Sequence, residues 1–89
     1  LSFACVCGHV DAARLLLDRG ADVHHRADSG HTCLNLACWC GHIAVVQLLL
    51  DNGADPNVAD NNGDTPKANA ESQGHSAIVD LLEKYASDN

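Results

Sequence analysis

The fold is decided by residues 30–55, which read GHTCLNLACWCGHIAVVQLLLDNGAD. The pair Gly41-His42 within this stretch recurs as Gly8-His9 and Gly74-His75, so the copies stand 33 residues apart. The same offset relates pairs of leucines, Gly-Ala-Asp triplets and Gly-x-Thr motifs: Leu15-Leu16, Leu48-Leu49 and Leu81-Leu82; Gly20-Ala21-Asp22 and Gly53-Ala54-Asp55; Gly30 with Thr32, and Gly63 with Thr65. A fixed period of this length indicates stacked copies of one supersecondary unit.

Residues 27–59 resemble an ankyrin repeat along their whole length, from the opening Gly30-His31-Thr32 to the closing Gly53-Ala54-Asp55-Pro56-Asn57. Residues 60–89 carry another copy, and residues 1–26 carry a partial one. The resemblance implies an all-α repeat solenoid, in which helix-turn-helix units stack side by side and hairpin loops, called fingers, project from them. We therefore expect a single domain over residues 1–89. Residues 60–89 would form its C-terminal capping repeat, and the whole would be a fragment of a longer array.

Capping residues predict where the helices begin and end. Thr65-Pro66 is typical of a helix start, because the Thr hydroxyl can accept a backbone N–H and Pro is tolerated at the first helical position. Gly41 suits the left-handed conformation that ends a helix, so we expect one helix from about Thr32 to Cys40 and a second beginning near His42. The second helix carries an apolar face that one unit cannot bury, made of Val45, Val46, Leu48, Leu49 and Leu50. Neighbouring repeats must bury it.

The last copy departs from the pattern at two positions. Lys67 stands where the preceding copy has Leu34, and Asn69 stands where it has Leu36. We expect both positions to pack against the preceding repeat, so their polarity should weaken the last unit. A solvated outer face on a terminal repeat explains part of this departure.

Composition excludes several classes of function. Apolar residues make up 46% of the chain and aromatic residues 3%, which favours helices packed through aliphatic side chains over a sheet-rich fold. Five basic residues against 12 acidic ones give a net charge of −7, without a basic stripe for nucleic acid or anionic lipid. No apolar run approaches the roughly 18 residues that span a bilayer. We therefore predict neither nucleic-acid binding nor membrane insertion.

The five cysteines and the recurring histidines suggest no chemistry of their own. Cys5, Cys7, Cys33, Cys38 and Cys40 are an odd number without the spacing of a secreted disulfide scaffold, which predicts an intracellular location, cytoplasmic or nuclear. Cys-x-Cys pairs suggest zinc half-sites, but residues two apart on a helix point to different sides, so we predict no metal. The His after each recurring Gly indicates a shared structural role. Cys40 with His42 lacks a third orienting group, so we predict no enzyme activity, cofactor or small-molecule substrate.

The resemblance implies a module that binds a partner protein through its concave face and fingers. In the family this face is built from the finger tips and from the last two residues of each first helix before its terminating Gly. Carried over to this sequence, the partner-binding positions are Val6, Cys7, Asp28, Ser29, His31, Trp39, Cys40, Asn61, Asn62, Asp64, Ser72 and Gln73. Residues 60–89 carry most of the acidic excess, which is either a solvated surface or a means of steering a basic partner.

Trp39, the only tryptophan, has two interpretations. Its ring could fill a gap in the core, or it could be exposed as a binding hot spot. Cys38 shares the helix side of Leu34, and the last copy has Ser72 at the position of Trp39. Both observations favour an exposed ring.

Two alternatives to partner binding stay open. Ankyrin repeats are substrates of an asparaginyl hydroxylase that acts on a finger Asn with a Leu eight residues before it. Asn57 after Leu49 matches this pattern, and His24 takes the equivalent place after Leu16, although Pro56 departs from the usual Val or Ile. The other alternative is a structural spacer within a larger repeat protein.

Overall fold

The computed structural model describes residues 2–26 and 30–87, with side chains described for 4–26 and 30–85. These residues form six α-helices: α1 (Ser2–Cys7), α2 (Val10–Asp18), α3 (Cys33–Cys40), α4 (Ile43–Asp51), α5 (Pro66–Ser72) and α6 (Ser76–Ser87). Within the described residues, the only β-type pairing is an isolated antiparallel β-bridge between Arg26 and Thr32. The all-α repeat fold predicted from the sequence is confirmed.

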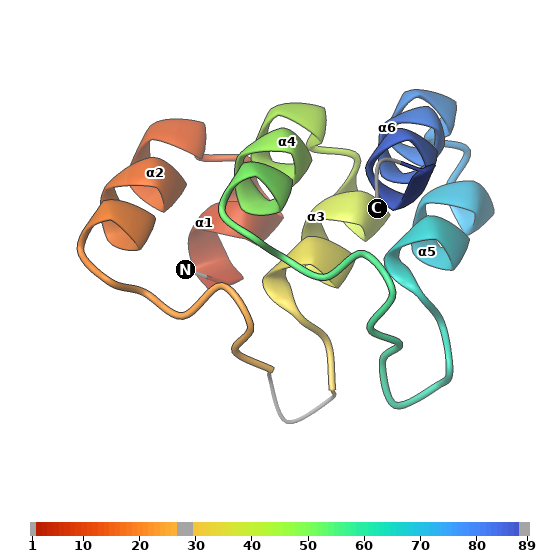
Figure 1. The fold of residues 1–89 in the computed structure, drawn as a ribbon, viewed down its shortest axis with the longest axis horizontal. Coiled ribbons are helices and arrows are strands. Elements are labelled where there is room, and N and C mark those ends of the chain that lie inside the picture. Colours follow the sequence, from red (N-terminus) through yellow and green to blue (C-terminus); the bar gives the residue numbers. More distant parts are fainter. Residues whose placement is uncertain (1, 27–29, 88–89) are drawn as a thin grey trace.

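The helices form two rows, with the fingers projecting from one of them (Figure 1). The inner row consists of α1, α3 and α5, each packed on the next, and the outer row consists of α2, α4 and α6. Each inner helix also packs on the outer helix that follows it, so the pairs α1/α2, α3/α4 and α5/α6 are the first, second and third repeats. The connections 19–32 and 52–65 carry the first and second fingers.

The helix boundaries follow from the capping residues. Thr32 and Thr65 each accept a backbone N–H through the side-chain oxygen, from Asn35 and Ala68, both at 3.2 Å. Gly41 ends α3 with φ of 82°, a left-handed conformation that a residue without Cβ adopts at little cost. The helix starts and the stop at Gly41 therefore agree with the sequence prediction.

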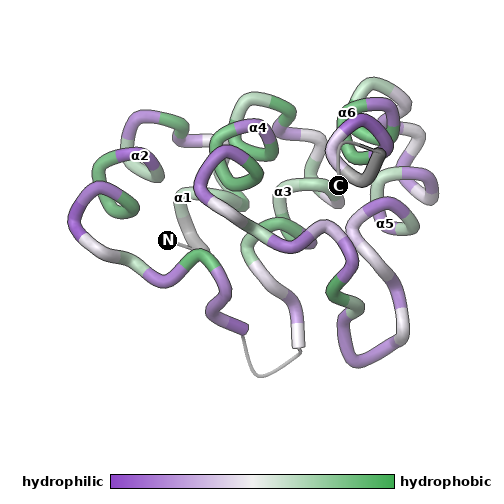
Figure 2. The backbone as a smooth tube through the Cα atoms, viewed as in Figure 1, coloured by the Kyte–Doolittle hydropathy of each residue, from purple (hydrophilic) through white to green (hydrophobic). Residues whose placement is uncertain are grey.

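The core lies between the two rows and between successive repeats. Figure 2 shows apolar residues concentrated on the helices and polar residues along the fingers. Leu49 in α4 and Leu82 in α6 are fully or almost fully buried, at 0% and 2% exposure. Leu16, their counterpart in α2, is 38% exposed. The same residue type in the same place is therefore buried only where a preceding repeat covers it.

Histidines tie successive repeats together through the backbone. His42 Nε2 donates to the carbonyl oxygen of Val6 at 2.8 Å, and His75 Nε2 donates to that of Trp39 at 3.2 Å. A Cβ added to Gly41 would approach the His75 ring to 2.6 Å, so the glycine also makes room for this ring. The structural role predicted for the recurring histidines is confirmed for His42 and His75.

The expectation that Lys67 occupies a core position is wrong. Lys67 is exposed, and its ammonium group lies 3.0 Å from Glu83. The hydrogen bond and the charge of Glu83 raise the pKa of Lys67. Leu34, the counterpart of Lys67, is buried because it lies with Ala54 and Val58 of the second finger, whereas no finger lies against Lys67 within residues 30–87. Asn69 is buried as expected, at 3% exposure.

Candidate binding groove

One carboxylate organises the tip of the second finger. Asp60 Oδ1 accepts the backbone N–H groups of Asn62 at 2.9 Å and Asp64 at 3.0 Å. The Asp60 backbone N–H donates to the carbonyl of Asp64, and the N–H of Gly63 donates to the carbonyl of Asp60. An Asp side chain that bonds the backbone two residues on is a common turn-forming device. The tip from Asp60 to Asp64 is therefore held in one conformation by its own first residue.

The same carboxylate joins the finger to both neighbouring repeats. Asp60 Oδ2 lies 3.1 Å from His31 Nε2, and the Asp60 side chain is almost fully buried. Burial opposes its ionisation, but the N–H donors of Asp64 and Asn62, together with His31, outweigh burial and lower the pKa of Asp60. The buried amide of Asn69 faces the carboxylate and adds to this effect. Asp60 is therefore a structural anion, because Oδ1 is engaged by the finger backbone and Oδ2 lies beside His31.

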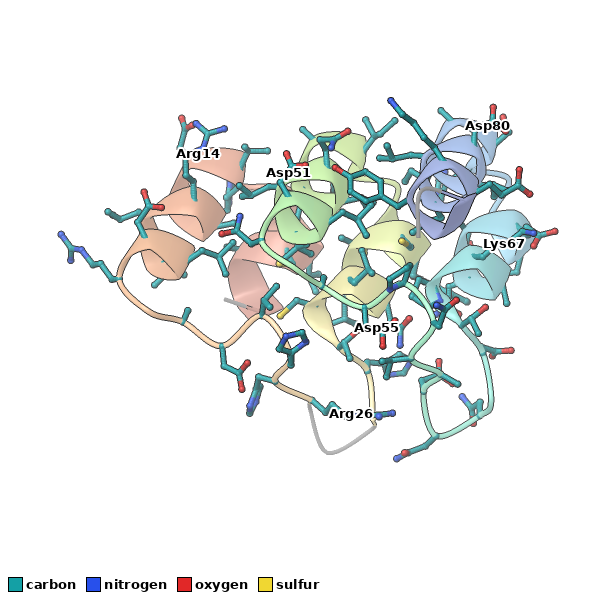
Figure 3. All side chains as sticks on the ribbon, viewed as in Figure 1. Arg14, Arg26, Asp51, Asp55, Lys67 and Asp80 are labelled. Atoms are coloured by element: carbon teal, nitrogen blue, oxygen red, sulfur yellow. The ribbon has the colours of Figure 1, made fainter. Side chains whose placement is uncertain are left out.

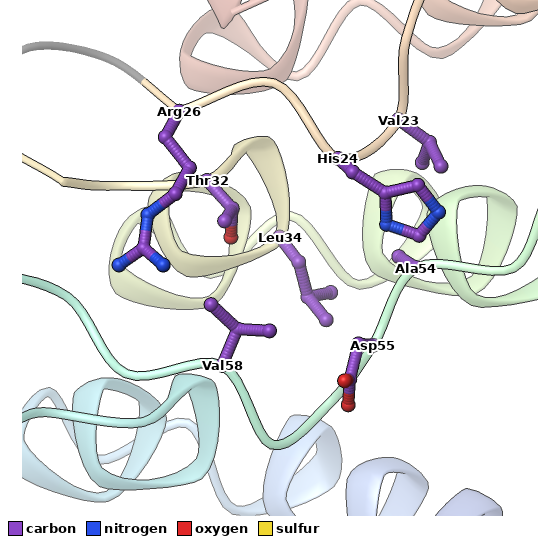
Figure 4. Close-up of a pocket in the computed structure, with 8 residues that line it drawn as sticks. All are labelled: Val23, His24, Arg26, Thr32, Leu34, Ala54, Asp55 and Val58. Atoms are coloured by element: carbon purple, nitrogen blue, oxygen red, sulfur yellow. The ribbon is translucent and has the colours of Figure 1, made fainter.

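Arg26 links the two fingers on the other side of this tip. Its guanidinium group donates to the carbonyl oxygen of Gly30 at 3.1 Å and to that of Ala59. Figure 4 shows Arg26 at a cavity of about 130 Å³, with Leu34 and Val58 on its walls and His24 and Asp55 beside them. The contacts of Arg26 are thus used to hold the fingers together.

A second, larger cavity opens on the inner row beside Trp39. Its volume is about 290 Å³, and it lies between α3, α5 and the tip of the second finger. We call it the Trp39 groove and define it by its lining residues: His31, Leu36, Trp39, Asp60, Asn62, Asp64 and Asn69. Trp39 lies on α3 and is 50% exposed. The ring is therefore available to a ligand rather than packed in the core.

Comparison with known protein families shows to which family these repeats belong. A model described as ankyrin repeats in three copies matches residues 1–60, and a second ankyrin-repeat model matches residues 41–83. The chain belongs to the ankyrin-repeat family. No curated protein matches it. Repeats of this family are generally protein-interaction modules and are typically non-catalytic.

The ankyrin-derived positions fall into three groups in the structure. Eight are exposed: Val6, Cys7, Trp39, Asn61, Asn62, Asp64, Ser72 and Gln73. His31 and Cys40 are half-buried, and Asp28 and Ser29 lie outside the described residues. The Trp39 groove brings together Trp39, His31, Asn62 and Asp64. The remaining described positions of the set do not line it.

Three residues of the groove were missed by the sequence analysis. Leu36 and Asn69 were interpreted as core positions, and Asp60 was not singled out. An Asp three residues before Gly63 at the start of a polar loop is a signal for a turn, and it could have identified Asp60 as the residue that shapes the tip. Val6, Cys7 and Cys40 were expected to bind a partner together with Trp39, but they do not line this groove, in which Leu36 is the apolar residue beside Trp39.

The outer row of this ankyrin domain presents a different surface. Arg14, Asp51 and Asp80 project from α2, α4 and α6 (Figure 3). Gln47 Nε2 donates to Tyr85 Oη at 2.6 Å, and both side chains also bond to Asp51. These polar contacts tie α4 to α6 on the outside of the stack.

Two of the cysteine thiols are held in their protonated form. Burial raises the pKa of Cys38 to about 12. A hydrogen bond with the Cys33 thiol and burial together raise the pKa of Cys5. A thiol must ionise to act as a nucleophile or metal ligand, so neither is suited to that chemistry near neutral pH. Among residues 4–26 and 30–85, no group of three or more His, Cys, Asp or Glu side chains is placed to hold a metal ion.

The candidate modification residues lie at equivalent places in the two fingers. Asn57 is exposed, and its backbone N–H bonds to Asp55 Oδ1 at 2.9 Å. His24 is also exposed and makes the same bond to Asp22 at 2.8 Å. Leu49, which a hydroxylase would read together with Asn57, is fully buried. An enzyme that reads both residues must therefore act on a locally opened repeat.

None of the described helices has the length and apolar character needed to cross a bilayer.

Proposed function

We propose that the three repeats act as one domain that binds a partner protein along the inner row and the fingers, with the Trp39 groove at the centre of the contact. The observation that carries this proposal is the half-exposed Trp39 in a cavity of about 290 Å³. Large aromatic side chains in pockets with polar rims are the residues that most often dominate binding energy. The ring has a polar rim, made of His31, Asn62 and Asp64.

The groove is a prepared site because its walls are fixed before a ligand arrives. The finger tip is held by Asp60, and the Trp39 carbonyl accepts a hydrogen bond from His75. A binding surface that is already ordered loses little conformational entropy on association. The groove therefore suits a short extended segment of a partner better than the polar outer row does. The acidic residues of the third repeat support a partner whose contacting surface is basic.

The proposal is tested by selecting ligands from random sequences, which leaves the choice of ligand to the domain itself. A displayed library of random peptides is panned on the domain, and the binding site of each selected peptide is mapped through the backbone NMR signals. We expect shifts at residues 31, 36, 39, 60–64 and 69, with little change in α2, α4 and α6. Shifts confined to the outer helices would contradict the proposal.

A matched pair of variants controls for general loss of apolar surface. Ile43 is 45% exposed, close to the value for Trp39, and it does not line the groove. Selected peptides should bind the Ile43→Ala variant as tightly as the unchanged domain and should bind Trp39→Ala more weakly by at least about 2 kcal/mol. Equal losses in the two variants would mean that the peptides recognise apolar surface rather than the groove.

A further inference from the structure

We propose that the Trp39 groove holds an arginine side chain of the bound segment. This inference rests on the proposed function and specifies the chemistry of its partner. The groove is lined by two acidic residues, Asp60 and Asp64, and its lining residues include His31 but neither Lys nor Arg. An aromatic face beside carboxylates is the environment in which a cation is held most favourably.

Only one of the two carboxylates remains for a ligand. Asp60 is almost fully buried and is engaged by two backbone N–H groups and by His31. Asp64 is exposed, and its carboxylate has no partner among the described residues, since the hydrogen bonds of Asp64 are made by its backbone. Asp64 is therefore the carboxylate that would pair with an incoming cation, and Asp60 is the one that fixes the position of the tip.

Trp39 determines which cation fits best. Trp39 is 50% exposed and lines the same cavity as Asp64. A guanidinium group is planar, so it can stack on the indole while its N–H fork bonds a carboxylate beside the ring. An ammonium group is a compact, strongly hydrated charge that gains less from such a face. The site should therefore prefer arginine to lysine, and it should reject a neutral side chain of the same shape.

Asn69 is not available to the bound segment. It is 3% exposed and lines the groove, and its amide faces the Asp60 carboxylate and helps to lower the pKa of that group. Asn69 therefore supports Asp60 from below, and Asp64 is left as the exposed acidic residue of the groove.

The cation is not supplied by the chain's own nearest arginine. Arg26 lines the smaller cavity of Figure 4, and its guanidinium group is held by the carbonyl oxygens of Gly30 and Ala59. Asp60, which lies next to Ala59, has its pKa lowered by the finger N–H groups and His31 rather than by Arg26. The charge of the groove therefore remains available to a partner.

The test uses three peptides that differ at one side chain. The peptide SGSRSGS is titrated into the full chain and followed by the indole N–H signal of Trp39, the only indole in the protein. Versions with lysine and with citrulline, which keeps the shape of arginine without its charge, serve as the comparison. We expect a saturable shift with arginine, and affinities about fivefold lower for lysine and about tenfold lower for citrulline.

A matched pair of charge variants places the cation. Asp64→Asn should lower the affinity for the arginine peptide by about fivefold. Asp80→Asn removes the same charge from the exposed surface of α6 and should change that affinity by less than about twofold. Equal affinity for arginine and citrulline, no shift with any of the three peptides, or equal effects of the two variants would each overturn the inference. Library peptides that bind the groove without carrying arginine would also overturn it, while leaving the proposed function intact.

Discussion

The second and third repeats have matching helices but differ in what covers them. Leu34 in α3 is 1% exposed because it lies with Ala54 and Val58 of the following finger. Lys67, at the same place in α5, is exposed and pairs with Glu83. Leu50 and its counterpart Glu83 show the same contrast, since Leu50 is 5% exposed. A repeat position is therefore a core position only when the next repeat is present to cover it.

Other positions are exposed in both repeats. Trp39 and Ser72 occupy equivalent places in α3 and α5, and both are exposed although the second repeat has neighbours on both sides. Stacking does not use this position, so its side chain can vary without loss of the fold. The comparison thus separates residues that stabilise the stack from residues that are available for binding.

The largest expected effect on stability comes from giving the second repeat, at position 34, the lysine that the third repeat has at the equivalent position 67. Leu34→Lys would bury a charge where the second finger closes over the helix, so it should destabilise the domain by about 3 kcal/mol or more. Chemical denaturation followed by circular dichroism measures this loss. A small change would mean that the second finger leaves Leu34 accessible.

A smaller effect is expected from two of the three glycines that follow the inner helices. Gly41→Ala combines the strain of a positive φ with a Cβ only 2.6 Å from the His75 ring, so it should cost about 2–3 kcal/mol. Gly74→Ala carries the same strain with no atom within 4 Å of its Cβ and should cost about 1 kcal/mol. The measurement is the difference between the two unfolding free energies. Equal costs would show that the His75 ring moves aside freely.

Asp60, in the second finger between the second and third repeats, should make the free energy of unfolding depend on pH. The pKa of Asp60 is lowered from its ordinary value of 3.8, so its ionised form stabilises the folded state above that pH. This contribution is lost as the pH falls through the lower, folded pKa. Asp60→Asn should therefore be less stable than the unchanged protein at pH 6, and the difference should shrink below pH 3.8. Urea midpoints measured across this range for both proteins provide the test, and a constant difference would contradict it.

The smallest effect on stability is expected when the third repeat receives the leucine that the second repeat has at the equivalent position. Lys67→Leu removes an exposed ion pair with Glu83 and adds no buried contact, so it should change the melting temperature by no more than about 2 °C. Differential scanning calorimetry can resolve such a change. A clear increase would restore the sequence-based expectation that this position is part of the core.

The contrast between Lys67 and Trp39 shows how far sequence reasoning reaches. Thr32, Thr65 and Gly41 act within one turn of their helices, so their roles could be predicted from local spacing. The exposure of Lys67 could not be predicted, because burial at this position depends on a finger that, within the described residues, covers the second repeat and not the third. The exposure of Trp39 was predicted from its helix side and from the Ser at the equivalent place.

The groove itself was only partly predictable. His31, Asp60 and Asn69 come from the start of the second repeat, the second finger and α5, and only the stacking of the repeats brings them into one cavity. The resemblance to ankyrin repeats implied that the finger tip binds a partner, which stays a prediction. It did not indicate that the Asp60 carboxylate would hold that tip in place while Asp64 remained exposed.

The most direct test of the binding surface is to measure stability and affinity together for Trp39→Ala. A half-exposed ring contributes little to the core, so the melting temperature should stay within about 5 °C of the unchanged protein. The affinity for a peptide selected on the groove should fall by at least about 2 kcal/mol. Loss of several kcal/mol of stability with unchanged affinity would contradict the account, because it would show that Trp39 stabilises the stack and does not bind the partner.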